Sequence, residues 1–123
     1  MENKSREMVQ IAYDALDEKL GHDIEILKIN EISVIADYLI IASGDNQNQI
    51  TAMTDLVEEK LAQAGYTNKR VEGNKNSTWI LMDYGDVIIH VFSKEDRLFY
   101  DLERIWRDGK KVGREELIAR GRE

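Results

Sequence analysis

The sequence of 123 residues contains no cysteine and no proline. Without cysteine, the chain can form neither a disulfide framework nor a thiolate metal site. Long apolar runs are also missing, since a stretch such as Tyr38 to Ala42 is far too short to span a bilayer, and Met1 to Lys4 do not open a signal peptide. We therefore expect a soluble, cytoplasmic protein that makes no membrane contact. At this length a single domain buries about two-thirds of its unfolded surface without cross-links.

Positive charge is in the minority, because 17 Lys and Arg stand against 24 Asp and Glu, for a net charge of −7. Residues 107–123 hold six basic and four acidic residues, so they carry +2 and leave −9 on residues 1–106. A body this acidic repels phosphate backbones, so we expect no direct binding of nucleic acid and regard a basic protein as the better partner. The alternative is that the charge only keeps the domain soluble, and charge alone favours that alternative.

Hydrophobic periodicity predicts helices and strands that alternate along the chain. Helices are expected over residues 4–20, from the cap at 45–46 to residue 64, and from the cap Ser93 to about Gly109; strands are expected over 23–29, 36–44, 69–72 and in the two halves of 78–92. The order α-β-β-α-β-β-β-α indicates an α/β domain with a mixed sheet of about five strands and helices packed on it. This domain is expected to span residues 1–109, and the charged segment 110–123 is expected to be a disordered tail.

Residues 78–92 form the most informative stretch. Two runs rich in β-branched and aromatic residues flank Asp83-Tyr84-Gly85-Asp86, which is typical of an antiparallel hairpin with a tight turn. Side chains alternate along a strand, so Trp79, Leu81 and Asp83 are expected to share one face. Both faces of the hairpin are mostly apolar. Either helices cover both faces, or one face is free to bind a partner.

Three patterns could carry chemistry, and a structural role is favoured for each. Ser43-Gly44 between a strand and a helix is a common phosphate-binding position, but the loop continues with Asp45 and contains no lysine, which favours a plain turn. Asp83 and Asp86 flank a turn instead of lying at i and i+2 of one strand, so they are expected to accept backbone hydrogen bonds and not to hold a metal. His90 is expected to be a hydrogen-bonded core or interface histidine. We expect no catalytic residue, cofactor or metal.

Trp79 is the strongest candidate for a binding residue. It begins an apolar strand face with acidic residues nearby at Glu72, Asp83 and Asp86, a composition that suits an interface anchor with an acidic rim. An ordinary core tryptophan is an equally good interpretation from composition alone. Trp106 is expected to lie in the core, because it completes the apolar stripe of its helix.

Four separated motifs give the sequence a family resemblance. They are Asp37–Gly44, Val71-Glu72-Gly73, Trp79–Phe92 and Arg97–Trp106. In this order and spacing they resemble the ribosomal silencing factor family, also called RsfS, YbeB or Iojap. The resemblance runs from about residue 5 to residue 107, and the tail beyond Lys110 falls outside it.

The resemblance implies a nucleotidyltransferase-like fold that has lost its catalytic acids. It also implies binding to protein fourteen of the large ribosomal subunit, with steric blocking of small-subunit joining and repression of translation. A role in late large-subunit assembly, and a homodimer when free, are further implications. The less favoured alternative is a divergent magnesium-dependent nucleotidyltransferase that uses Ser43-Gly44 with Asp83 or Asp86.

Carried over by position, the resemblance implies that Trp79 contacts the ribosomal protein. Leu81, Asp83, Tyr84 and Asp86 are further candidates, because they belong to the same motif. Glu72 is a candidate from charge complementarity with a basic partner.

Overall fold

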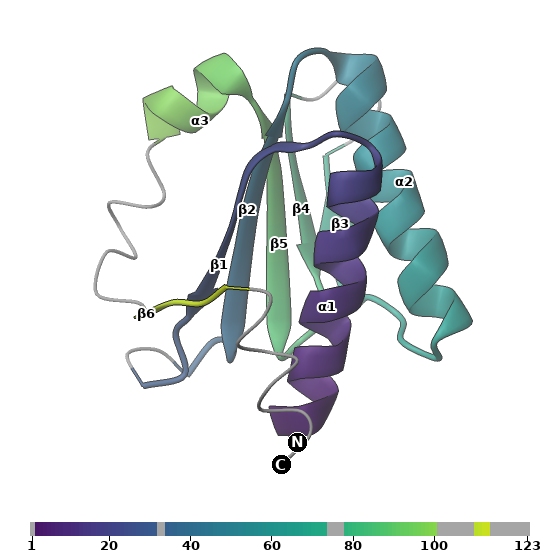
Figure 1. The fold of residues 1–123 in the computed structure, drawn as a ribbon, viewed down its shortest axis with the longest axis vertical. Coiled ribbons are helices and arrows are strands. Elements are labelled where there is room, and N and C mark those ends of the chain that lie inside the picture. The colour runs from purple at the N-terminus through teal and green to yellow at the C-terminus, as the bar shows by residue number, and fades with distance from the viewer. Residues whose placement is uncertain (1, 32–33, 74–77, 101–109, 114–123) are drawn as a thin grey trace.

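The computed structural model describes residues 2–31, 34–73, 78–100 and 110–113 (Figure 1). Its elements are α1 (Glu2–Glu18), β1 (His22–Lys28), β2 (Tyr38–Gly44), α2 (Gln47–Gln63), β3 (Arg70–Glu72), β4 (Trp79–Asp83), β5 (Val87–Ser93), α3 (Lys94–Tyr100) and β6 (Lys110–Lys111). The strands form one sheet in the order β3-β4-β5-β2-β1-β6. Strands β2 and β5 run parallel, and the other neighbours are antiparallel. The predicted α/β fold with a mixed sheet is confirmed; its likeness to nucleotidyltransferases stays a prediction.

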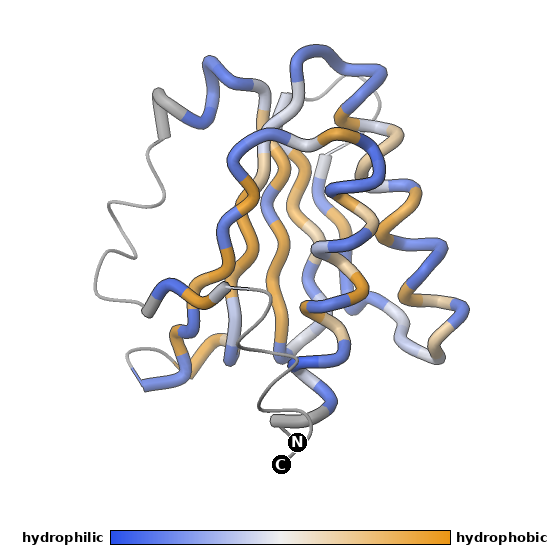
Figure 2. Tube along the Cα trace, viewed as in Figure 1, coloured by the Kyte–Doolittle hydropathy of each residue, from blue (hydrophilic) through white to orange (hydrophobic). Residues whose placement is uncertain are grey.

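Helices α1 and α2 cover one face of the sheet (Figure 1). Figure 2 shows the hydrophobic residues concentrated along the central strands and on the helix sides that face them. Strand β2 is buried at all seven positions, as predicted for a central strand flanked on both faces. The main core cluster joins the inner stripes of both helices to this face, and includes Met8, Leu16, Ile40, Ile50, Val57, Met82 and Ile89.

Helix α3 lies on the other face of the sheet (Figure 1). Buried Arg97 holds it there, because its guanidinium donates to the carbonyl oxygen of His22 at 3.3 Å and lies 3.6 Å from the carboxylate of Glu25. This second face carries a smaller apolar cluster, with Trp79 and Ile88 packed against its buried members Leu27, Ile29, Ala36, Leu39, Ile41 and Phe92. The candidate Trp79 therefore belongs to the face opposite α1 and α2.

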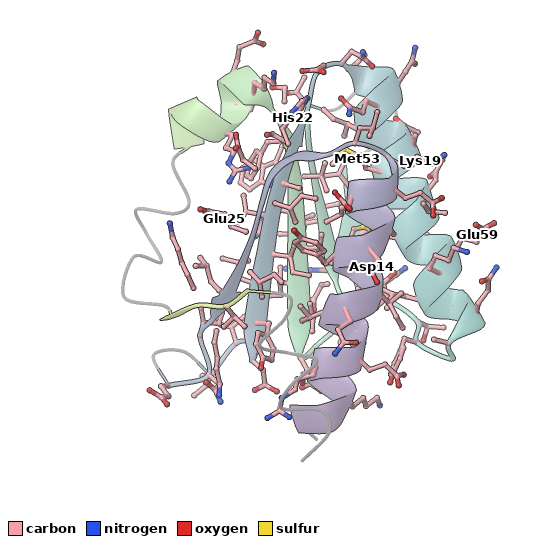
Figure 3. The ribbon with its side chains drawn as sticks, viewed as in Figure 1. Asp14, Lys19, His22, Glu25, Met53 and Glu59 are labelled. Carbon is pink, nitrogen blue, oxygen red and sulfur yellow. The ribbon has the colours of Figure 1, made fainter. Side chains whose placement is uncertain are left out.

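The first helix ends without a glycine in the left-handed conformation. Leu20 adopts the positive φ of 61° instead, although Gly21 follows it directly. Gly21 lies in a close approach, because a Cβ atom there would lie 2.7 Å from Cε of Met53 and 3.0 Å from the carbonyl oxygen of Leu16. Figure 3 labels Met53 beside this end of α1. The glycine thus allows the α1–β1 connection to pass directly over α2.

Helix α2 begins with the predicted cap, Asn46. Its side-chain oxygen accepts a hydrogen bond of 2.8 Å from the amide of Gln49. The side chain of Gln49 reaches back to the amide of Asp45, one residue before the position of a standard capping box.

We expect Asn46→Ala to lower the free energy of unfolding by about 1 kcal/mol in urea denaturation, because it leaves a helix amide without its acceptor. Exposed Asn48 in the same turn supplies the control Asn48→Ala; equal losses in both variants would contradict the cap assignment.

Residues 110–113, the described beginning of the expected disordered tail, are ordered, which corrects the expectation for these four residues. Lys110 and Lys111 pair with β1 at the sheet edge (Figure 1), and Val112 is buried, its amide donating to the carbonyl of Ile26 at 2.9 Å. Residues 101–109, which include the expected core residue Trp106, and residues 114–123 lie outside the described part. Among the described helices, none has the length and apolarity that a membrane span requires.

Candidate functional site

The hairpin turn between β4 and β5 is built by Asp83 and Gly85. The Asp83 carboxylate accepts a hydrogen bond of 2.8 Å from the amide of Gly85, and Gly85 has a φ of 85°, which glycine adopts without steric cost. The amide of Tyr84 donates to the carbonyl of Val87 at 2.9 Å and closes the turn. Asp83 therefore has the predicted role of accepting a backbone hydrogen bond in the turn.

Three aromatic rings lie together on the second face of the sheet. Trp79 stands opposite Phe92 in the β4–β5 ladder, with their ring centroids 5.0 Å apart and stacked. His90 lies 5.8 Å from both rings, and its Nδ1 accepts a hydrogen bond of 2.9 Å from Nε1 of Trp79. Stacked aromatic pairs contribute beyond the area that they bury. The rings thus fix the orientation of the Trp79 side chain.

His90 is a buried neutral histidine. Its side chain is only 7% exposed, and this burial lowers its pKa to about 4. At neutral pH the imidazole is uncharged, and its Nδ1 is an acceptor because it receives the indole proton. The structure therefore supports the predicted core role: His90 orients Trp79 and is poorly placed to take up a proton near pH 7.

The half-buried side chain of Trp79 lines a shallow hollow of about 240 Å³. Its walls are Glu72, Gly73, Trp79 and Leu81, and we call it the Trp79 hollow. Leu81 lies two residues from Trp79 on the same strand face, and Glu72 stands directly opposite Leu81 in the β3–β4 ladder. At the β3 edge of the sheet, the apolar side chains of Trp79 and Leu81 therefore lie beside one exposed carboxylate, that of Glu72.

Arg70 offsets part of the negative charge at this edge of the sheet. Its guanidinium lies 3.2 Å from the carboxylate of Glu72 and 3.7 Å from that of Asp83, its ladder partner. The Arg70 and Glu72 side chains are mostly exposed, so solvent screens their attraction and leaves both free to exchange partners. Asp83 lies on the same face as the Trp79 hollow, two ladder positions beyond Leu81.

Tyr84 and Asp86 lie apart from the other four candidates. Tyr84 is 7% exposed and belongs to the core cluster under α1 and α2, because the next side chain after Asp83 points to the opposite face. Burial is the main cause that raises the pKa of Tyr84. Tyr84 and Asp86 line a separate hollow of about 350 Å³, together with Lys4 and Lys69, which neither Trp79 nor Glu72 lines. The structure therefore brings together Glu72, Trp79, Leu81 and Asp83, but not all six candidates.

The Ser43-Gly44 turn is filled by the protein's own groups. Ser43 is buried and donates to the carbonyl of His22 at 3.2 Å. Asp45 lies 2.8 Å from Nζ of Lys94 and 3.0 Å from Nε2 of His22, and the hydrogen bonds from Lys94 and then His22 lower its pKa. These contacts fit the plain turn that the sequence favoured. Among the described residues, no three side chains of His, Asp or Glu gather closely enough to hold a metal ion.

Sequence reasoning missed the two residues on either side of Glu72 at the sheet edge. Val71 is 40% exposed although it is apolar, and it lies at the centre of the edge strand β3. Gly73 has a φ of 100°, and a Cβ atom there would lie 2.7 Å from the carbonyl oxygen of Trp79. The Val-Glu-Gly motif contained this signal, but only the sheet order shows that β3 is an edge.

Comparison with known proteins gives one consistent family. Residues 2–123 match the profile of the family described as "Ribosomal silencing factor during starvation". The match includes the tail beyond Lys110, which the sequence motifs had left outside. Similar proteins include the ribosomal silencing factor RsfS of Halalkalibacterium halodurans, 35% identical over 94% of this chain and 98% of the relative. That of Bacillus subtilis is 36% identical over 84% of this chain and 87% of the relative.

A crystal structure of a Chromobacterium violaceum protein has the same fold. It superposes with a TM-score of 0.80 at 34% sequence identity, covering 87% of this chain and 88% of the other. The family match covers residues 2–123, and the superposition covers 87% of the chain. The chain belongs to the ribosomal silencing factor family.

Proposed function

We propose that this protein binds the large ribosomal subunit through its protein fourteen and sterically blocks association with the small subunit, which represses translation. Family membership and the names of the relatives support a ribosome-silencing role. The observation that carries the proposal is the Trp79 hollow, in which an oriented, half-buried tryptophan lies beside an exposed carboxylate at the sheet edge. Tryptophan in such a setting is the residue type most often found as an interface anchor.

The physical mechanism needs no bond to be made or broken. A net charge of −7 attracts a basic protein surface over a distance, which speeds association and makes it sensitive to salt. Trp79 and Leu81 then bury apolar area against the partner, with Glu72 and Asp83 at the rim. The bulk of the bound domain occupies the space that the small subunit needs. The site of action would be the cytoplasm, and the free protein would be a homodimer.

Sedimentation on sucrose gradients tests this function directly. Purified large subunits are mixed with the protein, and small subunits are then added. We expect the protein to co-migrate with large subunits and to reduce the yield of joined ribosomes. Binding without loss of joining would point instead to a role in large-subunit assembly. No binding would contradict the proposal, and saturable binding of ATP or CTP with magnesium in calorimetry would then favour the nucleotidyltransferase alternative.

A further inference from the structure

The edge strand β3 is flanked by hollows on both faces of the sheet. The Trp79 hollow lies on one face, and a second hollow of about 150 Å³ lies on the face covered by α2. Thr51, Thr54, Asp55 and Glu58 of α2 line this second hollow together with Val71, Gly73, Ile80 and Met82. We call it the Glu58 hollow. Gly73 lines both hollows, so the two faces are separated there by backbone alone, without a side chain.

The side chains of β3 alternate between these hollows. Val71 points to the Glu58 hollow, whereas Glu72 points to the Trp79 hollow, and Arg70 shares the face of Glu72. All three residues of β3 are exposed, and in the described part of the chain β4 is its one strand neighbour. The outer side of β3 therefore offers main-chain donors and acceptors, which can pair with an incoming strand.

We propose that β3 binds an extended, basic segment of the protein partner by adding it as a further strand to the sheet. This inference rests on the proposed function and specifies how the partner is bound. Successive side chains of an added strand point to opposite faces, so one set faces Asp55 and Glu58 and the other set faces Trp79 and Glu72. The matching segment alternates basic residues on the α2 face with apolar residues on the other.

The negative charge beside both hollows favours a basic segment over another occupant. Asp55 and Glu58 are exposed acids at one hollow, and Glu72 is an exposed acid at the other. Arg70 is the one basic side chain of β3, and it already lies against Glu72 and Asp83 on the Trp79 face. On the α2 face, the lining of the Glu58 hollow contains two acids and no base. Lysine or arginine from an added strand would be favoured there.

A matched pair of variants on α2 tests the inference. Glu58 lines the Glu58 hollow, whereas Glu59 lies on the outer side of α2 (Figure 3). Glu58→Lys and Glu59→Lys change the net charge equally, so their effects on long-range attraction to the subunit are matched. We expect Glu58→Lys to weaken binding to large subunits about 10-fold more than Glu59→Lys does, because it places a like charge against the added segment. The readout is co-sedimentation across a protein concentration series.

Hydrogen exchange of the complex gives an independent readout. Within residues 70–73, the amides that point away from β4 should exchange more slowly when large subunits are bound, because carbonyls of an added strand accept their hydrogen bonds. This inference would be overturned if Glu58→Lys and Glu59→Lys had equal effects and exchange in β3 were unchanged on binding. The proposed function would remain intact in that case if Trp79→Ala still bound weakly. Failure of the unaltered protein to bind subunits would overturn both. Slower exchange that follows protein concentration alone would identify a second copy as the occupant, which also overturns it.

Discussion

Replacement of Trp79 by alanine is expected to weaken binding to large ribosomal subunits about 30- to 1,000-fold, which corresponds to the roughly 2–4 kcal/mol typical of a central aromatic anchor. The indole is held in place before binding, because Phe92 stacks on it and His90 accepts its N–H. Little side-chain entropy remains to be lost when a partner covers it, so most of its burial contributes to affinity. Co-sedimentation with a labelled protein measures the change directly.

The fold must survive for this result to be interpretable. Trp79→Ala leaves Nδ1 of buried His90 without its donor, which costs about 1–3 kcal/mol of stability. Circular dichroism and urea unfolding check that the variant is folded. Leu81→Ala provides a second test of the hollow, with Leu56→Ala as its control, since Leu56 is a similarly half-buried leucine on α2. Full affinity in folded Trp79→Ala and Leu81→Ala proteins would remove the Trp79 hollow from the binding site.

Acidification from pH 7 to pH 4 is expected to remove about 3 kcal/mol of folding stability through His90 alone. The ordinary pKa of 6.5 applies to the unfolded chain, whereas burial lowers the pKa in the fold to about 4. At pH 7 both states are neutral, so the full stability is present. As the pH falls from 6.5 toward 4, the unfolded state binds a proton that the folded state cannot, and stability is lost. Urea unfolding at a series of pH values measures this loss.

A pair of histidine variants isolates the contribution of His90. His90→Asn keeps an acceptor oxygen near the position of Nδ1 but does not titrate, so its stability should fall less steeply between pH 6.5 and 4 than that of the unaltered protein. His22→Asn is the control, because His22 is partly exposed and contacts Asp45 at the surface. A pH dependence that is unchanged in His90→Asn would show that His90 is not the buried neutral group.

The secondary structure and the two sides of the hairpin follow from local pattern. Period-two alternation predicts that Trp79, Leu81 and Asp83 share a face, and the ladder with β5 confirms it. A continuous apolar run predicts a strand buried on both faces, and β2 is buried throughout. These features depend on neighbours in sequence, which a pattern records directly.

The candidate site is only partly readable from the sequence. Tyr84 follows Asp83 in the same motif, yet alternation sends its side chain into the core on the opposite face. Glu72, a candidate from charge alone, lines the same hollow as Trp79 because β3 pairs with β4 in a register that sets Glu72 against Leu81. Register between strands depends on distant packing and loop geometry, which local pattern does not contain.

Sequence pattern alone was enough to predict the α/β class, helices α1 and α2, strands β1 to β5, a tight hairpin turn at Asp83 and Gly85, and the family. Tertiary structure decided which strand became the edge, and that Lys110 and Lys111 join the sheet instead of beginning a free tail. It also decided that His90 is neutral and holds Trp79. The physical reason is range: periodicity and turn chemistry act over a few residues, whereas strand order, burial and desolvation arise only when distant segments pack together.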